Sequence, residues 1–493
     1  MPYVLGVDVG TSRTRAAVCR DTHVGWTDPV PVALGTRHPG VPTVVYLAPD
    51  RSVMVGEEAE RQAGGDPVRV ARGFTRRIGD DVPLVLGGFP CTAQELTAVL
   101  VRWVVDRVAE QEGGPADALV VTHPAEWGVH RKGLLHHELA RQGLGEVTLL
   151  PEPIAVAEGY PAAPTTPGDL LATYGLGAGT ATAAVLRRTT VGTFELVGDI
   201  AGAEPLGGGH FDDAVVECVR AQLGRALDGL DPADPQAWLA MARLRGMCTG
   251  AKEMLSTEFE VIVPVRLPDE PADVRVTRTE FERVIRPAVA AGADLLPRAV
   301  RAAGVEAKDL SAVVLTGGSV RVPLVPQLVD AALAGAAKSV VVPDPEAAVA
   351  LGAATAARRL LTGPDAEIVP PGAAEHTEVL RRSAIALYAG EQALDPDDVA
   401  AEFGVDPPER PPVDVIPIEL PERRLLPRFL SGIRPTTLTV STIVLAAAGI
   451  VLTFVLESGT GSHSSPTSPL HIGPADQTTN RSAQTASGQP DGH

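Results

Sequence analysis

Two segments of this chain repeat one pattern of strand, glycine turn and second strand, and this repeat limits the possible folds more than any other feature. Residues 4–18 read VLGVDVGTSRTRAAV, and residues 171–185 read LATYGLGAGTATAAV. Each begins with an apolar, strand-like run, turns at a glycine, and ends in Ala-Ala-Val. A glycine turn between two such runs is typical of a β-hairpin. Two related hairpins about 170 residues apart predict a fold with two related halves.

Around the hairpins, strand-like runs alternate with helix-like stretches. The strand-like runs are residues 4–9, 118–121, 170–173 and 313–315, and the helix-like stretches include residues 93–110 and 280–303. Such alternation is typical of an α/β fold. We therefore expect residues 1–362 to form a globular α/β part.

The charge balance and the cysteines exclude several classes of protein. The chain has 42 basic and 61 acidic side chains, a net charge of -19. This excess of acid repels phosphodiester backbones, so we expect no nucleic-acid partner. The cysteines form no Cys-x-x-Cys pair, which argues against a zinc ribbon and a disulfide framework. We expect all of them to be small core residues: Cys19, Cys91, Cys218 and Cys248.

The histidines do not predict a metal site. His136 and His137 are adjacent on a predicted helix and therefore face different directions. No His-Glu-x-x-His motif accompanies them, nor does one accompany His123, His130 or His210. Structural or surface roles are expected for these side chains.

One segment near the C-terminal end has the composition of a membrane span. Residues 438–456 read LTVSTIVLAAAGIVLTFVL and carry no charge. As a helix they would extend over roughly 28 Å, about the thickness of a hydrocarbon core. The alternative, a buried core helix, needs a domain around it, whereas the flanks are rich in proline, serine and threonine. We therefore predict one transmembrane helix that contacts the lipid bilayer.

The sequence around this segment predicts its orientation. Four arginines precede it, at positions 423, 424, 428 and 434, and Glu457 follows it. The positive-inside rule then places the N-terminal part in the cytoplasm and the C-terminal tail outside, in a single-pass protein of the cell membrane. The chain begins with a strand-like run and not with a secretory signal. Residues 363–437 predict a proline-rich, semi-rigid cytoplasmic linker, and residues 457–493 a disordered extracytoplasmic tail.

The glycine turns also suggest chemistry. A tight turn with glycine lets backbone N–H groups approach an anion, and a following Thr or Ser hydroxyl adds a donor. Two such turns that face each other could hold a polyphosphate. Each turn alone is more often an ordinary hairpin, so the rest of the chain must support a binding function.

Six motifs, the first of them within the first glycine turn, give that support. They are Asp8-Val9-Gly10-Thr11, Val121-Thr122-His123-Pro124-Ala125, Pro151-Glu152-Pro153-Ile154-Ala155, Leu206-Gly207-Gly208-Gly209-His210-Phe211-Asp212, Thr316-Gly317-Gly318-Ser319-Val320-Arg321-Val322-Pro323 and Asp344-Pro345-Glu346-Ala347. Their order and spacing resemble the nucleotide-binding domain of the Hsp70 chaperones over roughly residues 1–360. The resemblance implies the actin-like ATPase fold, with two duplicated lobes and ATP or ADP and Mg²⁺ in the cleft. Nothing after residue 362 resembles the family's β-rich peptide-binding domain.

The resemblance also implies roles for single residues. It assigns Gly10, Thr11 and Ser12 to the first phosphate loop, and Gly177, Gly179 and Thr180 to the second. It places Asp8 near the metal ion, through water, and Glu152 where a glutamate positions the attacking water. The remaining nucleotide-binding residues that it implies are Gly208, Lys252, Ser256, Gly317, Gly318, Ser319 and Arg321. For Lys252 the alternative is a solvated helix lysine, and for Arg321 it is a surface ion pair.

The sequence departs from the family at charged positions. Thr75 stands where the family has a lysine, and a one-residue shift of the alignment would bring Arg76 to that place. Gly175 and Thr182 stand where the family has aspartates, and Arg13 replaces a small polar residue. Phosphoryl transfer depends on positioned positive charge and on carboxylate-held Mg²⁺. We therefore expect weak binding of Mg²⁺, and a cleft that binds ATP or ADP more readily than it hydrolyses ATP.

Three readings of the function follow from these observations. The first is a membrane-anchored, Hsp70-like ATP-binding protein, an ATP-dependent chaperone with weakened hydrolysis. The second is a nucleotide-sensing pseudo-ATPase that serves as a scaffold or regulator of an envelope or secretion assembly, with unidentified protein partners. The third is another protein of the actin-like fold, a sugar kinase or a filament former. The motifs at residues 206–212 and 316–323 fit the chaperone family better than the third reading.

Overall fold

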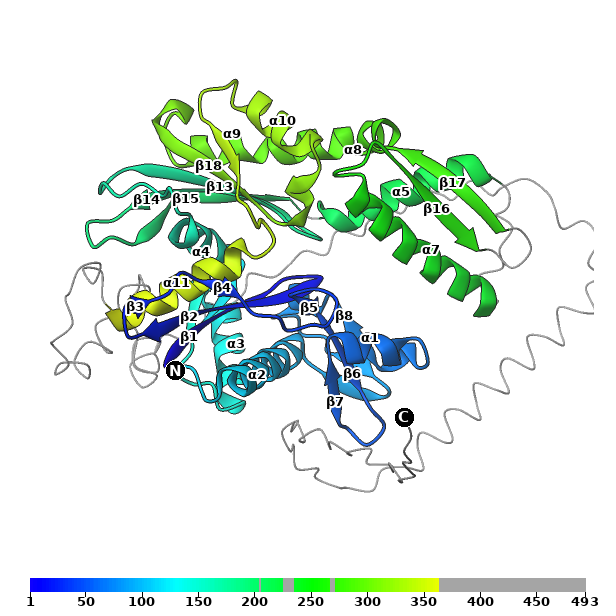
Figure 1. Ribbon diagram of the computed structural model, residues 1–493, viewed down its shortest axis with the longest axis horizontal. Coiled ribbons are helices and arrows are strands. Elements are labelled where there is room, and N and C mark those ends of the chain that lie inside the picture. The colour runs from blue at the N-terminus through cyan, green and yellow to red at the C-terminus, as the bar shows by residue number, and fades with distance from the viewer. Residues whose placement is uncertain (204, 225–234, 267–270, 363–493) are drawn as a thin grey trace, which may run out of the picture. The chain divides into compact units, whose positions relative to one another are not determined.

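The computed structural model describes residues 1–203, 205–224, 235–266 and 271–362 (Figure 1). The predicted linker, transmembrane helix and tail, residues 363–437, 438–456 and 457–493, lie outside the described residues. Within the described ranges, no helix combines the length and the apolar character that a membrane crossing requires.

The first predicted hairpin forms the centre of the first sheet. β1 pairs antiparallel with β2 and parallel with β11, and β11 pairs parallel with β12. The short strands β3, β4 and β5 pair with β2. The bounds are β1 Tyr3–Val9, β2 Arg13–Thr22, β3 Gly25–Trp26, β4 Val30–Pro31, β5 Val41–Pro42, β11 Ala118–His123 and β12 Thr148–Pro151. Nearly all of β1 is buried, as expected for a strand with helices on both faces of its sheet.

The second sheet repeats this strand order. β13 pairs antiparallel with β14 and parallel with β18. β18 pairs parallel with β19, and β14 pairs antiparallel with β15 at the edge of the sheet. The bounds are β13 Leu170–Leu176, β14 Ala181–Arg188, β15 Phe194–Ala203, β18 Leu310–Thr316 and β19 Ser339–Val341. The order β19-β18-β13-β14 matches β12-β11-β1-β2. The predicted α/β fold with two related halves is therefore confirmed, and each half is called a lobe below.

Two helices are exchanged between the lobes. α4 (Glu152–Gly159) follows β12 of the first sheet but packs on β13, β14 and β15 of the second. α11 (Ala348–Thr362) follows β19 of the second sheet but packs on β1, β2 and β11 of the first, as Figure 1 also shows. The two helices cross closely, because a β-carbon on Gly352 would lie 1.7 Å from the carbonyl oxygen of Ala155. Only glycine fits at this crossing.

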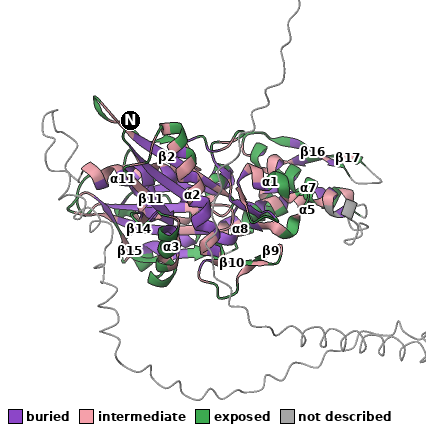
Figure 2. Ribbon diagram, turned by 90° about the horizontal axis from the view of Figure 1, so that it is seen from below, coloured by how far each residue is buried: buried purple, intermediate pink, exposed green. Residues whose placement is uncertain are grey.

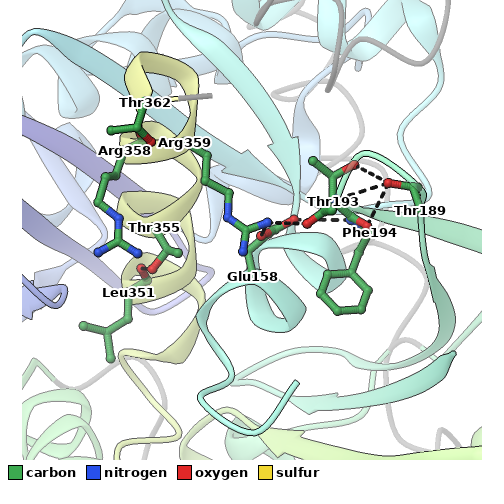
Figure 3. Close-up of polar contacts among 10 residues, drawn as sticks. Glu158, Thr189, Thr193, Phe194, Leu351, Thr355, Arg358, Arg359 and Thr362 are labelled. Carbon is green, nitrogen blue, oxygen red and sulfur yellow. Dashed lines mark hydrogen bonds and ion pairs between the residues drawn. The ribbon is translucent and has the colours of Figure 1, made fainter. Parts of the chain in front are cut away.

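A buried ion pair ties the far ends of these helices together (Figure 3). The Arg359 guanidinium of α11 lies 2.8 Å from the Glu158 carboxylate of α4, whose side chain is fully buried. The backbone N–H of Phe194, at the start of β15, donates to the same carboxylate at 3.2 Å. Burial raises the pKa of Glu158, while the charge of Arg359 opposes this rise. The contact joins α4, α11 and the β14–β15 hairpin.

The other face of the first sheet packs on α2 (Ala93–Glu112), next to α3 (Val129–Arg141). α2 begins at a capping box, in which Thr92 and Glu95 each bond the other's backbone N–H. It ends at Gly113, which has a left-handed conformation with φ 81°. Local sequence signals thus set both ends of this helix.

Each lobe carries an outer subdomain. In the first lobe it contains β6 Val44–Leu47, β7 Val53–Val55, α1 Glu57–Ala63, β8 Val70–Arg72, the 3₁₀ turn Phe74–Arg77, β9 Leu84–Leu86 and β10 Phe89–Cys91, with a further 3₁₀ turn at Pro67–Arg69. In the second lobe it contains α5 Gly208–Leu223, α7 Pro235–Met254, β16 Glu260–Arg266, β17 Pro271–Thr277 and α8 Arg278–Ala293. The second lobe is completed by α9 Leu295–Ala302, α10 Leu324–Ala332 and 3₁₀ turns at Ala307–Asp309 and Gly318–Arg321.

One helix-like stretch is divided in the structure. The sequence predicts helix over residues 280–303, whereas α8 ends at Ala293 and α9 begins at Leu295. Pro297 gives the physical reason, because it has no N–H to donate to Ala293 and so a continuous helix would lose a hydrogen bond there.

Burial follows the two sheets (Figure 2). Central strands such as β11 are largely buried, whereas β16 is buried only at alternate residues. The four cysteines are free and buried, which confirms their predicted role in the core.

Candidate functional site

The two hairpin turns meet at one cleft of about 650 Å³ that both lobes line. Most predicted site residues line it, including those predicted for the two phosphate loops, the carboxylates and the adenosine side. These are Asp8, Gly10, Thr11, Ser12, Glu152, Gly177, Thr180, Gly208, Lys252, Ser256, Gly317, Gly318, Ser319 and Arg321. Gly175 and Thr182 also line the cleft. Gly179 and Thr75 are not among the lining residues.

The first loop is held by a threonine of the outer subdomain. Thr43 Oγ1 donates to the carbonyl oxygen of Gly10 at 2.8 Å and lies 3.0 Å from Thr14 Oγ1. A β-carbon on Gly10 would lie 2.8 Å from the carbonyl oxygen of Arg13, so a side chain at this position would disturb the turn. These contacts fix the loop before any ligand binds.

The second loop is held by the start of α5. The backbone N–H groups of Gly208 and Gly209 donate to the carbonyl oxygens of Gly177 and Ala178, at 2.9 and 2.8 Å. Ser319 Oγ donates to the Gly177 carbonyl as well, at 3.1 Å. The motif at residues 206–212 therefore supports the second phosphate loop directly.

Lys252 lies inside the site and is not a solvated helix lysine. Only 15% of its side chain is exposed, and Nζ lies 2.9 Å from the Asp212 carboxylate. It also donates to the carbonyl oxygen of Gly208, at 3.3 Å. Its ammonium group thus joins α7 to the start of α5.

The loop at residues 317–321 closes the opposite wall. Gly317 has a positive φ of 91°, and a β-carbon there would lie 2.3 Å from the carbonyl oxygen of Leu176. Arg321 is 46% exposed and lies 3.6 Å from the Glu346 carboxylate and 3.7 Å from that of Asp344. Arg321 therefore lines the cleft, as predicted, and also forms ion pairs at the surface, which was the alternative prediction for this residue.

Two carboxylates lie at the base of the cleft. The Asp8 carboxylate accepts a hydrogen bond of 2.9 Å from Thr122 Oγ1, and burial raises its pKa. Burial, with the nearby charges of Asp8 and then Glu126, raises the pKa of Glu152 to about 8. Carboxylates placed this way would gain from a cation bound near them, which would lower both pKa values.

The positions that lack the family's aspartates face each other. Gly175 and Thr182 are register partners in β13 and β14, as Asp8 and Arg15 are in β1 and β2. A β-carbon on Gly175 would lie 3.0 Å from Thr182 Oγ1. The second hairpin is thus neutral at the place where the first one is charged.

The turn Phe74–Arg77 changes the interpretation of Thr75. If this segment were a strand, the side chain next to Thr75 would point to the other face. The structure has a 3₁₀ turn instead, and Thr75 is buried while Arg76 is exposed. A β-carbon on Gly179 would lie 3.3 Å from Arg76 Nη1 and 3.5 Å from Thr11 Cγ2. Arg76 of the first lobe therefore reaches the second phosphate loop.

Sequence reasoning missed the role of Arg15. Its guanidinium forms an ion pair with Glu346 of the second lobe, and His38 Nε2 lies 3.5 Å from the same carboxylate. The charge of Arg15 also acts to lower the pKa of Asp8. The hairpin register could have revealed this residue, because Arg15 faces Asp8 once the turn is placed at Gly10.

The comparisons with known proteins agree with this arrangement. The protein family described as Hsp70 protein matches residues 84–369. Chaperone protein HscA homolog of Pseudomonas putida is 32% identical over 378 residues, which cover 72% of this chain and 57% of that protein. Chaperone protein DnaK of Elusimicrobium minutum is 28% identical over 372 residues, which cover 74% of this chain and 58% of that protein. Chaperone protein DnaK of Thermotoga maritima is 27% identical over 359 residues, which cover 71% of this chain and 58% of that protein. The chain thus spans 57–58% of the length of these relatives.

Proposed function

Because the chain belongs to the Hsp70 family, we propose that its two lobes bind ATP or ADP in the cleft between the glycine loops. The main observation behind this proposal is that the two glycine loops line one cavity together with Lys252, Ser256 and Arg321. Hydrogen bonds from neighbouring segments hold both loops in place. The family membership also argues against a sugar kinase and a filament former.

The residues present fit a magnesium nucleotide, with the metal held indirectly. Among the described residues, no group of three or more His, Cys, Asp or Glu side chains could hold a metal ion alone. Mg²⁺ commonly binds through one or two carboxylates together with substrate phosphates and water. Asp8 is the residue that would contact its water shell, and the bound ion would neutralise charge on the phosphates. Glu152 would orient water near the terminal phosphate.

Hydrolysis of ATP is expected to be weak. Gly175 and Thr182 supply no charge, and Thr75 cannot replace a lysine ammonium group. Loss of such groups lowers transition-state stabilisation by several kcal/mol, whereas backbone N–H contacts of the loops persist. An ATP-dependent chaperone with weakened turnover is the first form of this proposal.

A nucleotide-sensing pseudo-ATPase is the second form. It is favoured by the neutral second hairpin, where Gly175 faces Thr182. In this form the lobes respond to nucleotide and recruit protein partners of an envelope or secretion assembly.

Calorimetry and phosphate release on the full-length chain test the proposal. We expect ATP and ADP to bind, with Mg²⁺ adding little affinity, and phosphate release to be slow. The variant that combines Thr75→Lys with Gly175→Asp restores both missing charges, and we expect its turnover to rise at least tenfold, about 1.4 kcal/mol of barrier. Absence of nucleotide binding would overturn the proposal, whereas fast turnover of the native protein would overturn only the weakened hydrolysis.

We also propose that residues 438–456 anchor the chain in the cell membrane. The support is the uncharged 19-residue sequence with arginines before it. A tag after His493 should be accessible from outside intact cells, and a tag before Met1 should not. Reversed accessibility would contradict the proposed topology and remove the cleft from cytoplasmic ATP.

A further inference from the structure

We propose that Arg76 supplies the positive charge for the terminal phosphates that Thr75 does not provide. The inference rests on the proposed nucleotide binding and adds the residue that would let the cleft prefer ATP over nucleotides with fewer phosphates. Its basis is the position of the Arg76 guanidinium beside Gly179 of the second phosphate loop, where Nη1 lies 3.3 Å from the place of a β-carbon on Gly179.

The 3₁₀ turn Phe74–Arg77 explains how a neighbouring residue takes this place. Phe74 and Thr75 are buried, and Phe74 packs in the core of the first lobe. Gly73, which precedes them, has a left-handed conformation with φ 59°. Gly73 lines the cleft, whereas Arg76 is exposed and lies outside the set of lining residues. Thr75 thus anchors the turn, and Arg76 projects from it.

The guanidinium lies where the two phosphate loops come together. Arg76 Nη1 and Thr11 Cγ2 flank the position that a β-carbon of Gly179 would take, at 3.3 and 3.5 Å. Gly179 belongs to the loop of the second lobe and Thr11 to the loop of the first. A polyphosphate bound by both loops would therefore lie within reach of a long side chain anchored at the rim.

Arg76 is also available for an anion. Within the described ranges, no ion pair or hydrogen bond engages its side chain, although the chain is rich in arginine–carboxylate pairs. Its neighbour Arg77 is engaged: Nε lies 3.0 Å from the Asp80 carboxylate, and Nη2 donates to the carbonyl oxygen of Val82 at 2.7 Å. The two arginines thus differ in their surroundings although they are adjacent.

Guanidinium chemistry suits this position. Arginine presents several N–H donors in a plane and binds phosphate oxygens in pairs, while remaining charged at any physiological pH. Its greater length lets it act from the rim, whereas the family's lysine is at the position of the buried Thr75. The contact would form with the outer phosphates only, because AMP does not extend to this part of the loops.

The experiment compares ATP, ADP and AMP binding to the full-length chain and two matched variants. We expect Arg76→Gln to weaken ATP binding about tenfold or more and to leave AMP binding unchanged, since hydrogen bonds to charged groups contribute about 1.5–3 kcal/mol. Arg77→Gln removes the neighbouring guanidinium and should change neither affinity. Arg76→Lys keeps the charge and should retain part of the preference for ATP.

A rescue variant separates a phosphate contact from a structural role. Combining Arg76→Gln with Thr75→Lys places a cation at the family's position and should restore the preference for ATP. Equal losses for ATP and AMP, or no loss in Arg76→Gln, would overturn this inference while the proposed function stands. If the native protein binds none of the three nucleotides, the proposed function fails and this inference fails with it.

Discussion

At the residue scale, the two hairpins differ in the side chains that face each other across their strands. Asp8 faces Arg15 in the first hairpin, and Gly175 faces Thr182 in the second. Cross-strand partners lie close together on one face of a sheet, so each pair acts as a unit. The charge at the base of the cleft therefore comes from the first lobe. The substitution Gly175→Asp would place a carboxylate beside the hydroxyl of Thr182, which can rotate to donate a hydrogen bond to it.

His123 gives a prediction of pH dependence. Its ring stacks on Trp127, and Nδ1–H donates to the carbonyl oxygen of Pro124 at 2.8 Å. Burial lowers the pKa of His123 to about 4 from 6.5. Protonation therefore favours the unfolded chain, and the stability that the neutral ring provides is present above pH 6.5 and is lost as pH falls towards 4.

Chemical unfolding at pH 7 and pH 5 measures this effect. We expect His123→Gln to lose less stability than the native protein between these pH values, because its side chain does not take up a proton. His136→Gln, on the exposed face of α3, is the matched control and should keep the native difference. An unchanged difference in His123→Gln would show that other groups cause the acid sensitivity.

Most of the site could be predicted from residues, and two parts could not. The glycine loops, Lys252 and the loop at residues 317–321 were identified by motif, and they line one cleft. The sequence leaves open whether Thr75 or Arg76 takes the lysine position, because nothing in Phe-Thr-Arg-Arg distinguishes a 3₁₀ turn from an extended segment. The contact of Arg15 with Glu346 depends on the arrangement of both lobes, and such long-range pairs are not visible in local sequence.

At the element scale, the crossing of α4 and α11 determines what substitutions the molecule tolerates. Gly352→Ala would place a methyl group against the backbone of Ala155, which has no flexible atoms to move aside. We expect a loss of about 3 kcal/mol in the free energy of unfolding, the upper part of the range for overpacked sites. Thermal or urea unfolding measures it.

Gly133 offers a matched control for this change. It lies within helix α3, and a β-carbon there would have no neighbour within 4 Å. Gly133→Ala should therefore stabilise the chain by up to about 1 kcal/mol, the difference in helix propensity. Similar effects of the two substitutions would mean that helix propensity, and not the crossing, decides the outcome.

The elements themselves were predicted to different degrees. The strands at the sheet centres were found because continuous apolar runs are typical of buried parallel strands, as in β1 and β18. The break between α8 and α9 was missed, because both sides of Pro297 keep helical periodicity. The short strands β3, β4 and β5 carry little pattern and become evident only from their pairing with β2.

At the scale of the whole molecule, the described residues form five hydrophobic clusters, four of which pack on the two central sheets. One face of the first sheet packs on α2, and its other face packs on the alanines of α11. One face of the second sheet packs on the helices of its own lobe, and the other packs on α4 residues such as Val156 and Ala157. The repeat in the sequence predicted two halves, but not that each half would contribute a helix to the other.

This exchange of α4 and α11 makes each lobe depend on the other for its folding. Each half of the duplicated sequence keeps only one face of its sheet covered when it is separated from the other, so a cut in the segment between α4 and β13 leaves two pieces that each expose an apolar sheet face. Folding of one lobe then requires the other, and the molecule should unfold in one transition and not in two. A substitution that destabilises either lobe should therefore lower the stability of both.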